Sequence, residues 1–81
     1  MPSVLHVRGF RFYFYSHEPN EPPHVHVDKD SATLKVWLDP VEYARNRGFR
    51  RHEINGIVKL VAENRRVLLE AWHEHFGKDN R

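Results

Sequence analysis

The sequence predicts an α+β fold in which an antiparallel sheet of about four strands carries one long C-terminal helix on one face. In the first half of the chain, apolar and polar residues alternate, a period typical of strands. In the second half, apolar residues recur every three or four positions, as in an amphipathic helix. Because a sheet and a helix that each have one apolar face bury these faces against each other, we expect a two-layer structure.

The 81 residues are expected to form a single domain, 1–81. The chain has no cysteine, so neither a disulfide nor a thiolate zinc site can stabilise so small a core, and a homodimer is a reasonable expectation. No run approaches the roughly 20 apolar residues that a membrane span needs, and no signal-peptide pattern is present. We therefore expect a cytoplasmic protein that does not enter a membrane.

The segments expected to be strands are Val4–Val7, Phe10–Tyr15, His24–Val27 and Ala32–Leu38. Gly9 forms a hairpin turn between the first pair, and the polar run Asp28–Ser31 forms a turn between the second. The side chains expected on the helix-facing side are Phe10, Phe12, Phe14, Val25, Val27, Leu34, Val36 and Leu38. These strands follow one another as an antiparallel meander.

The segment from residue 40 to residue 47 has two interpretations. Asp39 as N-cap, Pro40 in the first turn and Gly48 as a stop indicate a short helix. A fifth strand at Val41–Ala44 is the alternative. The local pattern leaves both open.

The long helix is expected from about His52 to Phe76, with Gly77 as its C-terminal stop. Its apolar stripe consists of Ile54, Ile57, Val58, Val61, Leu68, Leu69, Trp72 and Phe76. A bend near Asn64 is left open. No Ser, Thr, Asp or Asn stands at the expected start, where the chain has Arg50 and Arg51, so the first helical residue is not fixed by a normal N-cap.

The sheet face opposite the helix is expected to be aromatic and cationic. By alternation it carries Arg11, Tyr13, Tyr15, His24, His26, Lys35 and Trp37. Aromatic side chains flanked by positive charge are how some sheets bind single-stranded RNA. Aromatic residues and arginine are also enriched at protein interfaces, so a protein partner is an equal alternative.

A basic segment follows the strands. Although the net charge is only +2, four arginines fall within seven residues: Arg45, Arg47, Arg50 and Arg51. The planar guanidinium fork suits phosphate groups, which favours RNA or an acidic protein as partner. A solvated loop without a partner is the alternative interpretation.

The proline-rich run that leads into His24 and His26 is the most site-like part of the sequence. Its prolines stiffen the backbone, and the two histidines point to one face of a strand. They can serve as acid and base for cofactor-free RNA cleavage, with Tyr13 or Tyr15 orienting a hydroxyl and Arg47, Arg50 or Arg51 stabilising negative charge on phosphorus.

Two other roles for these histidines remain open. They can bind a divalent metal with a carboxylate such as Glu21, Glu18 or Asp28 as third ligand. They can also simply anchor the loop. The chain has no serine nucleophile motif, glycine-rich phosphate loop or dinucleotide fingerprint, which excludes the common hydrolase, kinase and dehydrogenase classes.

Three segments of the chain are distinctive: GFRFYFYSHEPNEPPHVHV, KVWLDPVEYARNRGF and ENRRVLLEAWHEHFG. Together they resemble the small bacterial family called domain of unknown function 4160. The resemblance covers nearly the whole chain and implies a compact bacterial protein that is often encoded beside a second small protein, a layout similar to toxin and antitoxin pairs. It therefore implies the neighbouring small protein as a partner and action on RNA or translation as a toxin-like function.

Overall fold

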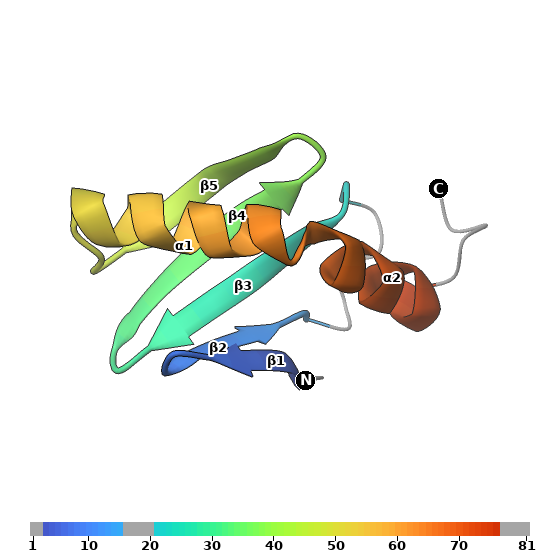
Figure 1. Ribbon diagram of the computed structural model, residues 1–81, viewed down its shortest axis with the longest axis horizontal. Helices are drawn as coiled ribbons and strands as arrows, with labels where there is room; N and C mark the ends of the chain where they lie inside the picture. Colours follow the sequence, from blue (N-terminus) through green and yellow to red (C-terminus); the bar gives the residue numbers. More distant parts are fainter. Residues whose placement is uncertain (1–2, 16–20, 77–81) are drawn as a thin grey trace.

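The computed structural model describes residues 3–15 and 21–76, and it has an α+β fold with a five-stranded antiparallel sheet and two helices (Figure 1). The strands follow the order of the sequence across the sheet: β1 (Ser3–Val7), β2 (Phe10–Tyr13), β3 (His24–Lys29), β4 (Ala32–Leu38) and β5 (Val41–Arg47). The helices are α1 (Arg51–Glu63) and α2 (Arg65–Phe76). The predicted fold class and meander are confirmed, but the predicted counts of four strands and one helix are wrong.

The β1–β2 hairpin forms where the sequence predicts it. Its two turn residues, Arg8 and Gly9, both have positive φ, at 53° and 84°. Positive φ at both positions gives a turn whose twist matches that of the flanking strands, and Gly9 adopts it without a steric cost. β2 ends at Tyr13, two residues before the predicted end at Tyr15, and β3 continues past Val27 to Lys29.

Residues 41–47 form a strand, so the short-helix interpretation is wrong. Asp39 and Pro40 make the turn between β4 and β5 instead of starting a helix. A helix here would have no apolar stripe to bury, whereas a strand satisfies the backbone groups along the free edge of β4. The alternative strand interpretation covered Val41–Ala44, and the observed strand continues to Arg47.

The predicted long helix is divided at Asn64 into α1 and α2. The side-chain Nδ2 of Asn64 donates a 2.8 Å hydrogen bond to the carbonyl oxygen of Leu60, and its backbone leaves the helical region with φ −110° and ψ 15°. α1 begins at Arg51 without a Ser or Asp cap. Glu53 Oε1 accepts a 2.8 Å hydrogen bond from the backbone N–H of Arg50, which supplies part of the missing cap.

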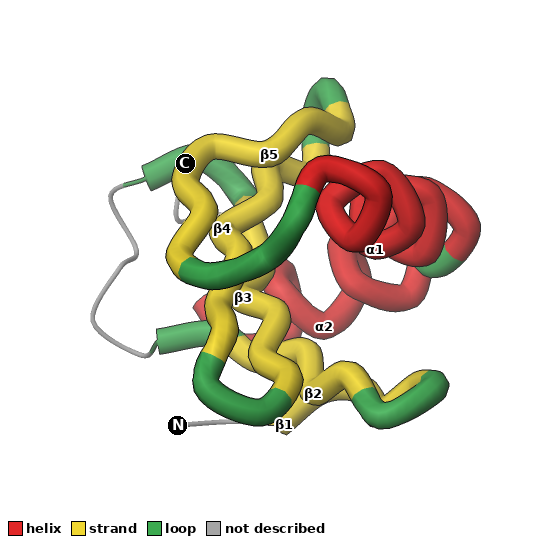
Figure 2. The backbone as a smooth tube through the Cα atoms, turned by 90° about the vertical axis from the view of Figure 1, so that its left-hand side faces the viewer, coloured by secondary structure: helices red, strands yellow, loops and turns green. Residues whose placement is uncertain are grey.

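Both helices lie on one face of the sheet, which leaves the other face uncovered by helix (Figure 2). The buried core between the layers consists of Phe12, Phe14, Val25, Val27, Leu34, Val36, Leu38, Phe49, Ile57, Leu60, Val61, Leu68 and Trp72. Of the apolar strand residues predicted for this face, all are buried except Phe10, which is partly buried. Phe49, in the turn before α1, is a core residue that the sequence did not predict.

The start of α2 is fixed to the turn between β4 and β5. Arg65 Nε donates a 2.7 Å hydrogen bond to the carbonyl oxygen of Leu38, and its guanidinium lies 3.2 Å from Asp39 Oδ1. This places α2 at the end of the sheet where β3 begins (Figure 1). Over the described ranges, neither helix has the length and apolar character required to cross a membrane.

Candidate nucleic-acid interface

The sheet face away from the helices, here called the open face, arranges its side chains in three rows across the strands. The rows are Arg11–Asp28–Thr33–Arg47, Tyr13–His26–Lys35–Arg45 and His24–Trp37–Glu42. Residues directly opposite one another on neighbouring antiparallel strands share a face, so each row is a continuous line of side chains. The open face therefore brings β2 and β5 residues into one surface.

A register shift in β5 decides which arginines reach the open face. Lys35 pairs with Arg45 while Val36 pairs with Tyr43, so Ala44 is an extra residue in β5. A bulge of this kind shifts the alternation by one residue. As a result, Glu42 and Arg45, three residues apart, both face the open side.

The side of the open face nearest β2 and α2 is occupied by rings that pack on one another. This His–aromatic half consists of Tyr13, Tyr15, His24, His26 and Trp37. His26 is stacked on Tyr13 at 5.4 Å between ring centroids and meets the ring of Tyr15 edge-on at 4.5 Å. Tyr13 and His26 are only 3% and 7% exposed, so their ring faces are used within the protein.

Within this half, His24 is fully buried. Its ring centroid lies 4.9 Å from that of Trp72 in α2, and its Nδ1 lies 2.9 Å from the carbonyl oxygen of Pro22. Because a carbonyl oxygen only accepts, Nδ1 carries the proton of this hydrogen bond. The next carbonyl, of Pro23, accepts a 3.0 Å bond from the backbone N–H of Leu38. Together these contacts fix the proline run against the sheet and α2.

The hydroxyl of Tyr13 donates a 2.9 Å hydrogen bond to Asp28 Oδ1. Burial raises the pKa of Tyr13 above its ordinary value of 10.0, and hydrogen bonds with Tyr15 and Asp28 and the negative charge of Asp28 raise it further. Tyr13 therefore stays neutral at physiological pH and acts as a fixed hydrogen-bond donor to the carboxylate.

Two cations of the open face are already paired within the protein. The guanidinium of Arg11 lies 3.4 Å from Asp28 Oδ2 and 4.5 Å from the centre of the Tyr13 ring. Lys35 Nζ lies 2.6 Å from Glu21 Oε1, a carboxylate oxygen that is also 3.8 Å from His24 Nδ1. These pairs neutralise part of the charge that the sequence suggests for this face.

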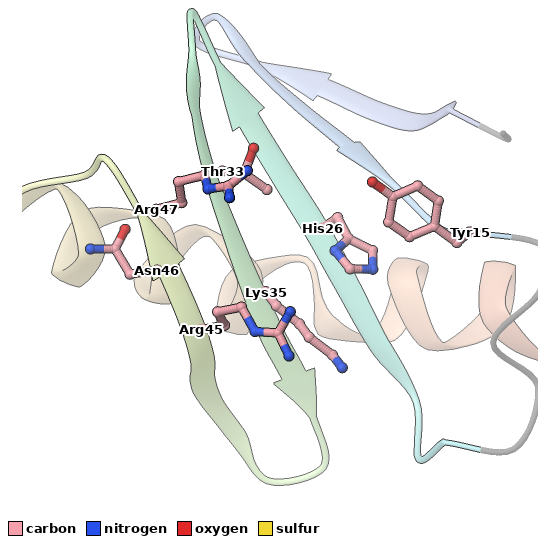
Figure 3. Close-up of a pocket in the computed structure, with 7 residues that line it drawn as sticks. All are labelled: Tyr15, His26, Thr33, Lys35, Arg45, Asn46 and Arg47. Carbon is pink, nitrogen blue, oxygen red and sulfur yellow. The ribbon is translucent and has the colours of Figure 1, made fainter.

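Arg45 and Arg47 behave differently, because both side chains are exposed and neither forms an ion pair within the described part of the chain. They belong to the basic half of the open face, defined as Thr33, Lys35, Arg45 and Arg47. A pocket of about 370 Å³ lies where the two halves meet. It is lined by Tyr15, His26, Thr33, Lys35, Arg45, Asn46 and Arg47 (Figure 3).

The structure brings five of the predicted site residues together around this pocket: Tyr15, His26, Lys35, Arg45 and Arg47. It places the others outside the pocket lining. Arg11, Tyr13, His24 and Trp37 lie elsewhere on the open face, and Arg50 and Arg51 lie at the start of α1. Sequence analysis missed Thr33 and Asn46; alternation along β4 identifies Thr33 as a neighbour of Lys35 on the same face, but placing Asn46 required knowing that β5 is a strand.

The interpretation of His24 and His26 as metal ligands finds no support in the described residues. No three His, Cys, Asp or Glu side chains in residues 3–15 and 21–76 are grouped so that they could hold a metal ion. Glu21, the suggested third ligand, directs its carboxylate to Lys35. Glu18, another suggested ligand, lies outside the described residues.

No curated protein and no solved structure matches this chain. A family model described as Domain of unknown function (DUF4160) matches residues 9–73, which include β2 to β5, α1 and most of α2. The resemblance noted in the sequence is thereby confirmed, and the chain belongs to this family of unknown function.

Proposed function

We propose that this protein binds single-stranded RNA through the basic half of its open face. The observation that carries the proposal is the pair Arg45 and Arg47, two exposed guanidinium groups without ion-pair partners in the described chain, on the same face of β5 and beside a pocket. Arginine binds phosphate through paired N–H donors, and two such groups on the same face of one strand can contact neighbouring phosphates.

The chemistry of the pocket favours a single strand over a duplex. One wall is cationic, from Arg45 and Arg47, and the other is aromatic, from Tyr15 and His26. Tyr15, which is only partly buried, is the ring that a base can reach, because His26 is 7% exposed and stacked on Tyr13. A nucleotide has the same two parts, an anionic phosphate and a flat base. Only an unpaired base is free to turn toward an aromatic wall while its phosphate stays on the arginines.

Cleavage of the bound RNA is a second candidate function, favoured by His26 and Tyr15, whose ring centroids lie 4.5 Å apart in this pocket. In this reaction the 2′-oxygen of a ribose bonds to the adjacent phosphorus as its proton passes to His26. The bond from phosphorus to the 5′-oxygen breaks, and that oxygen takes a proton from Tyr15. The products are a 2′,3′-cyclic phosphate and a 5′-hydroxyl, and Arg47 stabilises the extra negative charge on the phosphoryl oxygens.

Cleavage of cellular RNA would make the protein toxin-like, with the neighbouring small protein as its inhibitor. Induced expression in bacteria is then expected to arrest growth, and co-expression of the neighbour is expected to restore it. In the same cultures, RNA with cyclic phosphate ends should accumulate with the wild type and not with His26→Ala. Normal growth with intact RNA would contradict cleavage and leave only the binding proposal.

Binding is tested by fluorescence anisotropy with labelled oligouridine at low salt. The double variant Arg45→Ala, Arg47→Ala is expected to bind at least about tenfold more weakly, because two phosphate contacts and their counterion release are lost. Lys59→Ala, Arg66→Ala is the control with the same change in net charge: it removes two exposed positive charges from the helices, of which Arg66 lies 3.4 Å from Glu70 Oε2, and it should bind as the wild type does. Equal binding by all three proteins, or no binding by the wild type, would contradict the proposal.

A further inference from the structure

The basic surface does not end at the pocket. Arg50 and Arg51 follow Arg47 after a short turn and stand at the start of α1. Both side chains are exposed, and neither forms an ion pair within residues 3–15 and 21–76. Three residues of chain span at most about 11 Å, so Arg50 lies within that distance of Arg47 along the backbone. With Arg45 and Arg47 they make four exposed arginines between the end of β5 and the start of α1, a segment here called the corner.

This corner is held rigidly by contacts of the turn between β5 and α1. Asn46 Nδ2 donates a 3.0 Å hydrogen bond to the carbonyl oxygen of Phe49, and Asn46 Oδ1 accepts a 3.1 Å bond from the N–H of the same residue. The Phe49 ring is buried in the core. Gly48 has φ 99°, and a Cβ placed on it would lie only 3.1 Å from the Cβ of Ala32. The backbone positions of the arginines on either side of the turn are therefore fixed relative to one another.

The acidic side chain nearest in sequence does not neutralise this corner. Glu53 directs Oε1 to the backbone N–H of Arg50 at 2.8 Å, as part of the helix start. It is thus engaged in capping rather than in an ion pair with a guanidinium. None of the four arginines has an ion-pair partner within residues 3–15 and 21–76, so their guanidinium groups are available to the phosphates of an extended polyanion.

We propose that the RNA strand continues from the pocket over this corner, so that its phosphates contact Arg45 and Arg47 first and Arg50 and Arg51 next. This inference rests on the proposed RNA binding and extends it from a nucleotide pocket to a track along a strand. Because guanidinium groups contact phosphates and not base edges, the corner adds affinity that depends on length and salt and not on sequence.

The test compares two labelled oligouridines, of about 4 and about 12 nucleotides, in the same anisotropy measurement. The wild type is expected to bind the longer strand more tightly by about tenfold or more at low salt. In Arg50→Ala, Arg51→Ala, this gain is expected to disappear while the affinity for the shorter strand stays unchanged. For the longer strand, the slope of log affinity against log salt concentration should become less negative by about 1.4, because two phosphate contacts worth about 0.7 each are lost.

The control Lys59→Ala, Arg66→Ala removes the same amount of charge from α1 and α2 and is expected to keep the full gain with length. If Arg50→Ala, Arg51→Ala keeps the gain, or if the control loses it equally, the track is overturned while RNA binding stands. The same holds if the wild type binds both strands equally. If the wild type binds neither strand, the proposed function itself fails.

Discussion

The two halves of the open face lie on the same side of the same sheet, yet they differ in what surrounds their side chains. In the His–aromatic half, the rings of Tyr13, His24 and His26 are buried, and His24 reaches Trp72 of α2. In the basic half, Arg45 and Arg47 are exposed on the edge strand β5. Facing one side of a sheet therefore does not make a residue part of a binding surface. Most of the first half holds the fold, and only Tyr15 and His26 of it line the pocket, whereas the arginines of the second half are available to a ligand.

The largest loss of stability is expected when Trp72, the α2 residue that packs against His24 of the His–aromatic half, is replaced. Trp72→Ala is expected to lower the free energy of unfolding by about 3–5 kcal/mol, because it leaves a large cavity against Phe14 and His24. Val67→Ala, on the same helix but half exposed, should cost far less. Urea unfolding followed by tryptophan fluorescence or circular dichroism measures both, and equal small losses would show that α2 does not support this half.

The next largest effect is expected at His24. His24→Ala should lower the free energy of unfolding by about 2–3 kcal/mol, from lost packing against Trp72 and the lost hydrogen bond to the Pro22 carbonyl. The exposed His52 supplies the control, since His52→Ala should leave stability nearly unchanged. RNA affinity measured well below the unfolding transition should be the same for His24→Ala and wild type. A stable variant that has lost RNA binding would instead assign His24 to the ligand site.

A smaller effect concerns alkaline pH. The pKa of Tyr13 is raised in the folded state by burial and hydrogen bonds, so folding favours the neutral phenol. The stability that this contributes is fully present below the unfolded pKa of about 10 and is lost as pH rises above it. The free energy of unfolding should therefore fall more steeply above pH 10 in the wild type than in Tyr13→Phe, which has no group to ionise there. Parallel pH profiles for the two proteins would contradict this role.

The smallest effect on stability is expected in the basic half. Arg45→Ala and Arg47→Ala should each change the free energy of unfolding by no more than about 0.5 kcal/mol, because neither side chain has an ion-pair partner in the described chain. The same urea measurements test this, and the variants should differ from wild type in RNA affinity alone. A large loss of stability would mean that these arginines, too, hold the fold.

Alternation by itself determined much of this molecule. A period of two placed Phe12, Val25 and Leu34 on one face and His26 and Lys35 on the other, because successive side chains of a strand point to opposite sides. The three- and four-residue spacing determined that a helical layer covers the apolar face. These are short-range properties of the backbone, so they can be derived from the sequence without knowing the fold.

Three features were decided only by the tertiary structure: that residues 41–47 form a strand, where this strand has its bulge, and which side chains of the open face are buried. The capping signals at Asp39 and Pro40 are local, and they are overridden because β4 offers a free edge that a strand can satisfy. The extra residue Ala44 then turns Arg45 toward Lys35. Exposure depends on neighbours distant in the sequence, such as Trp72 beside His24, and no periodicity encodes such contacts. The sequence by itself therefore determined which side chains share a face, and the fold decided which of them a ligand can reach.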